Sequence, residues 1–203
     1  MSNAEKMLEI KDLSVIYKTD LETVYAVNGV TFSLEKGATL GLVGETGAGK
    51  TTLALTLMRL LPERTGKVTS GSITFEGEDI INLPEAQMCK IRGDKIAMIF
   101  QDPMTSLNPV LTVGEQIAEA LHVHNEAGRS KEEIDKRVDE TLTMVGIPPA
   151  RKNEYPHQFS GGMRQRVVIA IALSCEPDLL IADEPTTALD VTIQAQVLLM
   201  IRD

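Results

Sequence analysis

Residues 44–51 of the chain read GETGAGKT, which matches the phosphate-binding pattern G-x-x-x-x-G-K-[ST] at every fixed position. Residues 39–43 before it form a short apolar run that predicts a buried strand. Residues 51–61 after it are rich in Leu, Ala and Met and predict a helix that ends at Pro62. A strand, a loop and a helix in this order are the context that the pattern requires. The stretch therefore predicts an α/β fold with a loop that binds a nucleoside triphosphate.

The chemistry of this loop depends on its glycines and on one lysine. Glycines allow consecutive backbone N–H groups to turn toward phosphate oxygens, and the helix that begins near Lys50 directs the positive end of its dipole at the same anion. Lys50 would contact the β- and γ-phosphates, and the Thr51 hydroxyl would coordinate Mg²⁺. The alternative is a glycine-rich turn without a ligand. With glycine near 7% of average sequences, a chance match is on the order of one in a hundred.

Composition limits the classes of partner. The chain has 203 residues, which suits one domain, and its net charge of −9 disfavours nucleic acid or an anionic membrane as a non-specific partner. Cys89 and Cys175 lie far apart and outside any C-x-x-C pattern, so neither a disulfide framework nor a thiolate metal site is indicated. The longest apolar run, residues 167–173, is too short to span a bilayer. Membrane association is therefore expected only through a partner.

The order of apolar runs along the chain predicts an α/β frame with a helical insertion. Further β-type runs lie at residues 8–16, 25–34, 72–75, 96–100 and 178–183. A capping box at Ser130–Glu133 begins one amphipathic helix, and residues 163–175 predict a second helix that is largely buried. We expect a single domain over residues 1–203 that contains a mainly helical subdomain over residues 103–176.

Two carboxylates end an apolar strand near the end of the chain. Residues 179–184 read LLIADE, and ligands of open α/β sheets bind at the carboxyl ends of the strands. Asp183 would hold Mg²⁺ through water, while Glu184 would orient and deprotonate the attacking water. A solvated strand end explains such a pair equally well when it stands alone. The phosphate loop in the same chain favours the catalytic interpretation.

A third motif, Ser160-Gly161-Gly162, precedes the long apolar helix. A serine followed by two glycines is typical of a helix N-terminus with accessible N–H groups, which is a second place for an anion. An ordinary serine cap is the alternative. The position of the triplet shortly before Asp183 and Glu184 favours a functional role. The pair His122 and His124 has no third ligand nearby, so we expect solvated or packed side chains rather than a metal site.

These motifs in this order, together with Gln101 and the sequence ALD at residues 188–190, resemble the nucleotide-binding domain of ABC transporters over nearly the whole chain. Two longer stretches, QDPMTSLNP at residues 101–109 and YPHQFSGGMRQR at residues 155–166, are similar to the ATPases of oligopeptide, dipeptide and nickel importers. The resemblance implies a P-loop NTPase fold with a RecA-like core, an N-terminal antiparallel β-subdomain and an inserted α-helical subdomain. It implies ATP and Mg²⁺ as cofactors and ATP hydrolysis that drives import.

The resemblance also implies a role for individual residues. Tyr17 would stack on the adenine, although a half-buried strand aromatic is the alternative, and Tyr25 is a weaker candidate. Gln101 would sense Mg²⁺ and the attacking water. The expected nucleotide-binding residues are Tyr17, Gly44, Glu45, Thr46, Gly47, Ala48, Gly49, Lys50, Thr51, Thr52, Ser160, Gly161, Gly162 and Asp190. The expected metal ligands are Thr51, Gln101 and Asp183, and the expected catalytic residues are Glu184, Gln101 and Lys50.

The implied partners are membrane-bound. Transmembrane permease subunits would meet the loop after Gln101, and a second ATPase subunit, identical or different, would pair head to tail so that Ser160 and Gly162 contact its γ-phosphate and Asp190 lies across the interface. A solute-binding protein would act indirectly, and no nucleic acid is expected. The protein would lie peripherally at the cytoplasmic face of the cell membrane and be soluble when isolated.

Two alternatives remain open. The first is a soluble ABC ATPase of translation or DNA repair, whose paired domains, coiled-coil insertions or zinc modules do not occur in this sequence. The second is a module that binds nucleotide without turnover. It is suggested by the end of the sequence at Asp203, since ABC domains continue after Asp190 through a helix into another core strand and a histidine that contacts the γ-phosphate.

Loss of that strand and histidine has two expected consequences. The strand would lie between the strand that enters Gly44 and the strand that ends at Asp183. An unfilled gap there would leave backbone N–H and C=O groups of the neighbouring strands unpaired, and each buried group without a partner costs ~1–3 kcal/mol. We therefore expect the gap to close by rearrangement or by a strand from another chain. Loss of the histidine is expected to lower turnover by roughly 10²–10³-fold.

Overall fold

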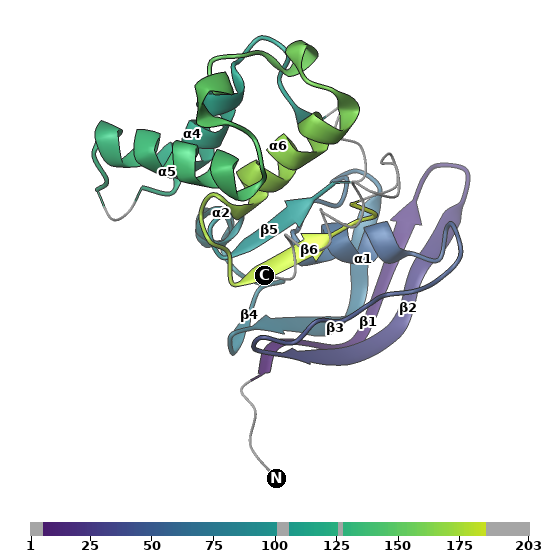
Figure 1. The fold of residues 1–203 in the computed structure, drawn as a ribbon. Helices are drawn as coiled ribbons and strands as arrows, with labels where there is room; N and C mark the ends of the chain where they lie inside the picture. Colours follow the sequence, from purple (N-terminus) through teal and green to yellow (C-terminus); the bar gives the residue numbers. More distant parts are fainter. Residues whose placement is uncertain (1–5, 101–105, 126–127, 186–203) are drawn as a thin grey trace. The chain divides into compact units, whose positions relative to one another are not determined.

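The computed structural model describes residues 6–100, 106–125 and 128–185 (Figure 1). The chain divides into two compact units, residues 1–88 and residues 89–203. Helix α2 (Glu85–Ile91) spans the boundary between them. The helices α4, α5 and α6 of the second unit all fall inside the range 103–176 that the sequence assigns to a helical subdomain.

The first unit is built on an antiparallel sheet in the order β2-β1-β3-β4. Its strands are β1 (Lys6–Lys18), β2 (Thr23–Glu35), β3 (Gly66–Phe75) and β4 (Glu78–Asp79). The central strand β1 pairs with β2 on one side and β3 on the other. The runs predicted at residues 8–16, 25–34 and 72–75 are therefore strands of one sheet.

An irregularity in β1 keeps its apolar residues on one face. Leu8, Ile10, Leu13 and Val15 are all buried, although the alternation of a strand would place Ile10 and Leu13 on opposite faces. The pairing register shifts between them, and Asp12 has a positive φ of 47°. A β-bulge of this kind restores the buried face after the extra residue.

The helix after the phosphate loop, α1, extends over Lys50–Leu57 and contacts β2. It is shorter than the predicted 51–61. Arg59 adopts a positive φ of 51°, its N–H donates to the carbonyl of Thr56, and the N–H of Leu60 donates to the carbonyl of Leu55. These two hydrogen bonds form a Schellman cap, which ends the helix before Pro62 is reached.

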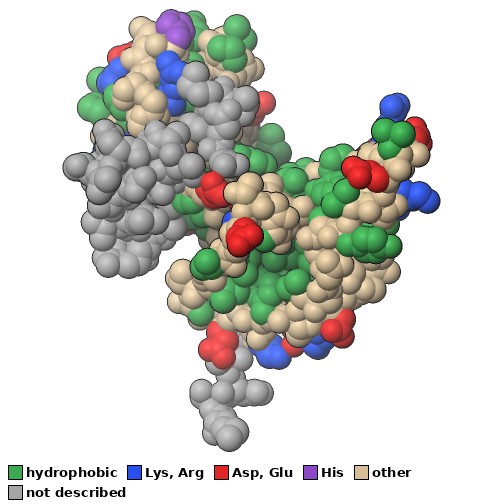
Figure 2. Space-filling model, turned by 90° about the vertical axis from the view of Figure 1, so that its right-hand side faces the viewer, with side chains coloured by type: hydrophobic (Ala, Val, Ile, Leu, Met, Phe, Trp, Pro, Cys, Tyr) green, Lys and Arg blue, Asp and Glu red, His purple; other side chains and the backbone are tan. Residues whose placement is uncertain are grey.

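The predicted strand at residues 39–43 is wrong. The segment is irregular and lies in neither sheet, and the side chain of Val43 is 100% exposed, with Leu40 and Leu42 also exposed. An apolar run becomes a strand only where a neighbouring strand supplies hydrogen bonds, and within the described ranges no strand pairs with this segment. Apolar side chains consequently reach the surface of the first unit (Figure 2).

The second unit combines two parallel strands with helices. Strands β5 (Ile96–Ile99) and β6 (Leu179–Ala182) pair in register from Ile96 opposite Leu179 to Ile99 opposite Ala182. The helices are α4 (Val113–Val123), α5 (Lys131–Met144) and α6 (Gly161–Leu173), with the 3₁₀ helices η1 (Pro149–Arg151) and η2 (Pro156–Gln158). All four residues of β5 are buried, as expected for a parallel strand covered on both faces.

Capping and burial explain the helices of this unit. Capping boxes begin α4 at Thr112 and Glu115 and α5 at Ser130 and Glu133, so the predicted box at Ser130 is confirmed. The core joins all three helices to β5, through Ile99, Ile117, Leu121, Ile134, Val138, Leu142, Val167 and Ile169. In the part of the chain that the structure describes, no helix combines the length and the apolarity needed to cross a membrane.

Candidate nucleotide-binding site

The loop at residues 44–49 requires glycine at its last position. Gly49 has a positive φ of 86°, and a Cβ atom built on it would lie 2.2 Å from the carbonyl oxygen of Ala26 in β2. Both the backbone conformation and the close approach therefore exclude other residues. Gly49 is also the N-cap of α1 and makes no side-chain hydrogen bond there. The cap residue of α1 thus supplies no side-chain acceptor to the first-turn N–H groups, which favours an anion there.

Lys50 lies over the loop that precedes it. Its Nζ donates to the carbonyl oxygen of Gly44 at 2.7 Å and to that of Glu45 at 3.1 Å. The N–H of Ala48 also donates to the carbonyl of Glu45, which closes a turn. The ammonium is therefore held among carbonyl dipoles at the loop, and an anionic ligand would compete for it with these two acceptors.

The residues of the first turn of α1 differ in exposure. Thr51 is exposed, whereas Thr52 is buried and its carbonyl accepts a hydrogen bond from the Thr56 hydroxyl at 2.6 Å. An exposed hydroxyl beside the phosphate loop suits an oxygen-seeking cation such as Mg²⁺. Thr51 therefore fits the predicted metal ligand.

The two candidate tyrosines lie on opposite faces of the sheet. Tyr17 pairs with Val24, whereas Tyr25 pairs with Ile16 and is 70% exposed. Since residues two apart on a strand share a face, Tyr17 lies on the face of Val15 and of its partner Val27. The Val27 side chain is also the one that approaches Gly49, with Cγ2 3.4 Å from the position of a Cβ atom there. The loop therefore meets the face of the sheet that carries Tyr17.

The carboxylate pair is positioned by the parallel strands of the second unit. The Asp183 N–H donates to the carbonyl of Ile99 at 3.0 Å, which continues the β5–β6 ladder one residue past β6. The Asp183 residue is 8% exposed, whereas Glu184 is exposed. Glu184 has a positive φ of 48°, which is uncommon for a residue with a side chain and concentrates at functional positions. The predicted location at the carboxyl end of a strand is confirmed.

Ser160 caps helix α6, as the sequence predicts. Its backbone is extended, with φ −65° and ψ 163°, and its Oγ accepts a hydrogen bond from the Met163 N–H at 3.4 Å. Ser160 and Gly161 are exposed, and a Cβ atom on Gly161 would meet nothing within 4 Å. Packing among the residues that the structure describes therefore does not require glycine at residue 161. An open position of this kind is compatible with the close approach of another molecule.

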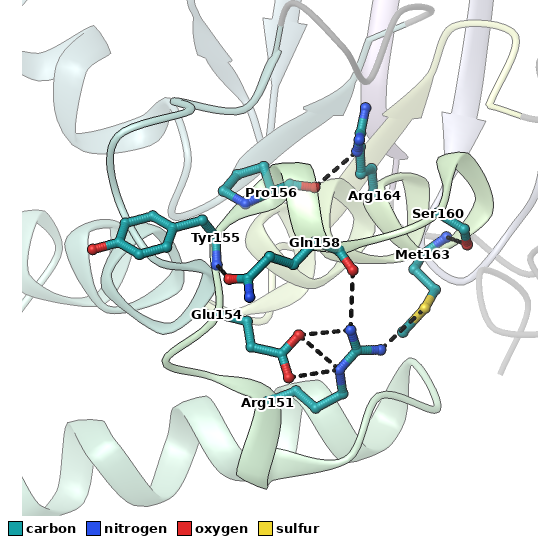
Figure 3. A network of polar contacts seen from close by, with 8 residues as sticks. All are labelled: Arg151, Glu154, Tyr155, Pro156, Gln158, Ser160, Met163 and Arg164. Carbon is teal, nitrogen blue, oxygen red and sulfur yellow. Dashed lines mark hydrogen bonds and ion pairs between the residues drawn. The ribbon is translucent and has the colours of Figure 1, made fainter.

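A polar network that the sequence did not predict lies around Arg151, beside the turn that contains the capping serine (Figure 3). The Arg151 guanidinium forms hydrogen bonds with the Glu154 carboxylate, the shortest 2.6 Å long, and donates to the carbonyl of Gln158 at 3.2 Å. This interaction lowers the pKa of Glu154 below its usual value. The signal in the sequence was the spacing of Arg151 and Glu154, three residues apart, immediately before the motif.

The histidines differ in exposure, since His122 is exposed and His124 is half-buried. His157 stacks on the ring of Tyr155, with a centroid distance of 5.7 Å. Among the described residues, no group of three or more His, Cys, Asp or Glu side chains could hold a metal ion. Gln101 and Asp190, which the sequence places at the metal and at the dimer interface, lie outside the described residues.

Comparison with known proteins relates these motifs to one family. The family described as ABC transporter matches residues 27–187. The oligopeptide transport ATP-binding protein OppD of Bacillus subtilis is 53% identical over 100% of this chain, which spans 57% of that protein. DppD of Bacillus subtilis, a dipeptide transport ATP-binding protein, is 54% identical over 98% of the chain and 59% of the relative. The oligopeptide transport ATP-binding protein OppD of Escherichia coli is 52% identical over 98% of this chain and 59% of that protein.

A solved structure shares the fold. The ATP-binding cassette MJ0796, determined as a dimer in a post-hydrolysis state with ADP and Pi, superposes with a TM-score of 0.85 at 32% identity, over 96% of this chain and 81% of that one. The chain spans less than two thirds of the length of the three transport proteins named above. The match over residues 27–187 and the similarity to ATP-binding proteins across nearly the whole chain show that it belongs to the ABC transporter family.

Proposed function

We propose that this chain is an ATP-binding and ATP-hydrolysing subunit that energises the import of oligopeptides or dipeptides. The observation that carries the proposal is the loop at residues 44–51, in which Gly49 is required by its contact with Ala26 and Lys50 lies over the carbonyl of Gly44. The names of the relatives support peptides as the cargo and favour them over nickel.

In this proposal the triphosphate displaces the internal partners of Lys50. Phosphate oxygens carry more negative charge than the carbonyls of Gly44 and Glu45, so the Coulomb attraction of the Lys50 ammonium to phosphate is stronger than its attraction to either carbonyl. The backbone from Gly44 to Thr52 surrounds the phosphates. Tyr17 stacks on the adenine, which is supported by its location on the sheet face that the loop approaches.

Hydrolysis is assigned to the candidate metal ligands and to Glu184. The Thr51 hydroxyl, the Asp183 carboxylate and the Gln101 side chain supply oxygen ligands of the kind that Mg²⁺ prefers. Bound there, Mg²⁺ would neutralise charge on the phosphates. Glu184 accepts a proton from the attacking water, and Gln101 orients that water. The backbone hydrogen bond from Asp183 to Ile99 supports a fixed position for the first carboxylate.

A second ATPase subunit, identical or related, completes the site. Its Ser160 and Gly162 contact the γ-phosphate, where the N-terminus of α6 adds a partial positive charge, and Asp190 lies across the interface. The open surface at Gly161 supports this assignment, as does the dimeric state of the structural neighbour. The subunits bind transmembrane permeases near the loop after Gln101 and so lie peripherally at the cytoplasmic face of the membrane. A solute-binding protein delivers the peptide, and nucleic acid takes no part.

An uptake experiment tests the cargo. Cells that lack the gene are supplied with the wild-type protein or with Lys50→Ala, and uptake of a radiolabelled tripeptide is compared with uptake of radioactive nickel. We expect the wild-type protein to restore peptide uptake, Lys50→Ala to fail, and nickel uptake to stay unchanged. Peptide uptake that does not depend on the protein would exclude the importer role. ATP binding without hydrolysis by the protein would favour the alternative of a binding module.

A further inference from the structure

The Arg151 side chain contacts residues on both sides of Ser160 (Figure 3). Before the serine, its Nη2 donates to the carbonyl of Gln158 at 3.2 Å, and the guanidinium lies 4.3 Å from the centroid of the Phe159 ring. After the serine, its Nη1 lies 3.3 Å from the sulfur of Met163. One guanidinium thus spans the turn that leads into α6.

Other contacts that the structure describes at the turn come from the Ser160 cap, Arg164 and Phe159. The capping hydrogen bond from the Met163 N–H to the Ser160 Oγ is long, at 3.4 Å, and Gly161 and Gly162 have no side chains to pack. A second arginine assists on the other side, since the Nε of Arg164 donates to the carbonyl of Pro156 at 2.8 Å. The Phe159 ring is 3% exposed and anchors the chain just before the serine. The contacts of Arg151 therefore act together with those of Arg164 and Phe159 to position the turn.

Glu154 fixes the guanidinium in its orientation. The Arg151 Nε is 3.0 Å from both oxygens of the Glu154 carboxylate, and Nη2 is 2.6 Å from Oε2. This fork leaves the second edge of the guanidinium to face Gln158 and Met163. Lysine cannot reproduce the arrangement, because its ammonium is a point charge without a planar fork.

The segment that carries Arg151 and Glu154 is itself attached to α4 and α5. The N–H groups of Val113 and Gly114, in the first turn of α4, donate to the carbonyls of Glu154 at 2.9 Å and Lys152 at 2.7 Å. The Lys152 Nζ pairs with Asp135 at 2.8 Å and Asp139 at 2.9 Å, both on α5. The two backbone hydrogen bonds from α4 therefore hold the base from which Arg151 reaches the turn, and they do not involve the Lys152 side chain.

From these contacts we infer that Arg151 is a positioning residue for the turn at Ser160–Gly162, acting through Gln158, Phe159 and Met163 rather than by touching nucleotide. The inference rests on the proposed function, in which Ser160 and Gly162 meet the γ-phosphate held by a second subunit. A displacement of about 1 Å in groups that contact the reacting phosphate can lower turnover by about 100-fold. Loss of Arg151 is thus expected to lower kcat by about 10- to 100-fold, while ATP affinity at the Gly44–Thr51 loop is retained.

The test compares Arg151→Met and Arg151→Lys with Lys152→Met in the intact protein. Lys152 is the matched control, because it is the next residue and also forms ion pairs, yet the partners of its side chain lie on α5 and not at the turn. The backbone hydrogen bonds from Val113 and Gly114 that hold the segment do not depend on this side chain. Phosphate release, ATP affinity and the melting temperature are measured for each. We expect both Arg151 variants to lose turnover with ATP affinity within about threefold of wild type, and Lys152→Met to keep turnover within about twofold.

Each comparison between variants has a result that would contradict the positioning role of Arg151. Wild-type turnover in Arg151→Lys, or an equal loss of turnover in Lys152→Met, would overturn the positioning role. The melting temperature identifies a variant that fails to fold, and Arg151→Lys, which keeps the charge, provides the comparison in that case. If the wild-type protein neither binds nor hydrolyses ATP, the proposed function fails first, and the positioning role fails with it.

Discussion

The Lys50 ammonium lies 2.7 Å from the carbonyl oxygen of Gly44, six residues earlier in the chain, and so closes the loop between them through a charged hydrogen bond. This contact and the one to Glu45 use two of the three donors of the ammonium. Nucleotide binding in our account replaces both carbonyls by phosphate oxygens. The loop is therefore held in shape by the group that later binds the ligand.

Removal of this ammonium is expected to abolish ATP binding in the micromolar range. Lys50→Ala leaves the phosphates without their cationic partner and should lower turnover by roughly 10²–10³-fold, by comparison with the loss of one preorganised donor. Isothermal titration with MgATP measures the affinity. Lys36→Ala is a suitable control, since Lys36 is exposed in a turn after β2. Equal affinity of the Lys50 and Lys36 variants would contradict the assignment.

Two glycine substitutions are expected to separate folding from function. Gly49→Ala forces a side chain onto a positive φ and into the carbonyl of Ala26, so its unfolding free energy should fall by more than about 1 kcal/mol. The added Cβ atom of Gly161→Ala meets no atom of the described residues within 4 Å, so the unfolding free energy should stay within about 0.5 kcal/mol of wild type. The turnover of this variant should fall if a second subunit approaches there. Urea denaturation and phosphate release measure the two effects. Similar stability losses in both variants would count against the described packing.

Base stacking is expected to depend on Tyr17 and not on Tyr25. Stacking of a base on an aromatic side chain contributes about 1–3 kcal/mol, so Tyr17→Ala should weaken ATP binding by about tenfold or more. Tyr25→Ala changes the opposite face of the sheet and should leave the affinity unchanged. Competition of ATP against a fluorescent analogue provides the measurement. A larger effect of Tyr25→Ala would reverse the assignment.

Stability should fall in acid through the Arg151–Glu154 pair. The Arg151 guanidinium lowers the pKa of Glu154 in the folded state. The pair therefore stabilises the protein fully above the usual glutamate pKa of about 4.3. This contribution is lost as the pH falls through the lower pKa of the folded state. Glu154→Gln removes the titrating group. Its unfolding free energy, measured in urea from pH 7 to pH 3, should therefore decline less steeply than that of wild type. Parallel curves would show that the pair does not contribute.

Short sequence patterns correctly predicted the elements that are determined by residues close together in the chain. The capping box at Ser130 and Glu133 begins α5, and the glycine spacing of the phosphate loop fits the positive φ angles of Gly47 and Gly49. Both features are visible in a short stretch of sequence. The runs at residues 8–16, 25–34 and 72–75 were predicted as strands for the same reason, from their β-type residues and the turn residues between them, whereas the short strand β4 was not predicted.

Features that depend on distant partners were not predicted. Residues 39–43 have the composition of a buried strand, yet in the described structure they lack a paired neighbour and remain irregular. The contacts of Arg151 with Phe159 and Met163 depend on how η1 packs beside α6, which no local pattern reveals. The end of α1 at Leu57 depends on a left-handed arginine, whereas the sequence suggested Pro62 as the stop signal.

We propose that the loop at Gly44–Thr51 binds ATP and that Glu184 activates water to hydrolyse it. Glu184→Gln tests both parts, because the amide keeps the shape of the side chain and cannot accept the proton. We predict that MgATP binds to this variant with an affinity within about threefold of wild type, while phosphate release falls by about 10²-fold or more. Phosphate release at the wild-type rate, or failure of either protein to bind ATP, would contradict the account.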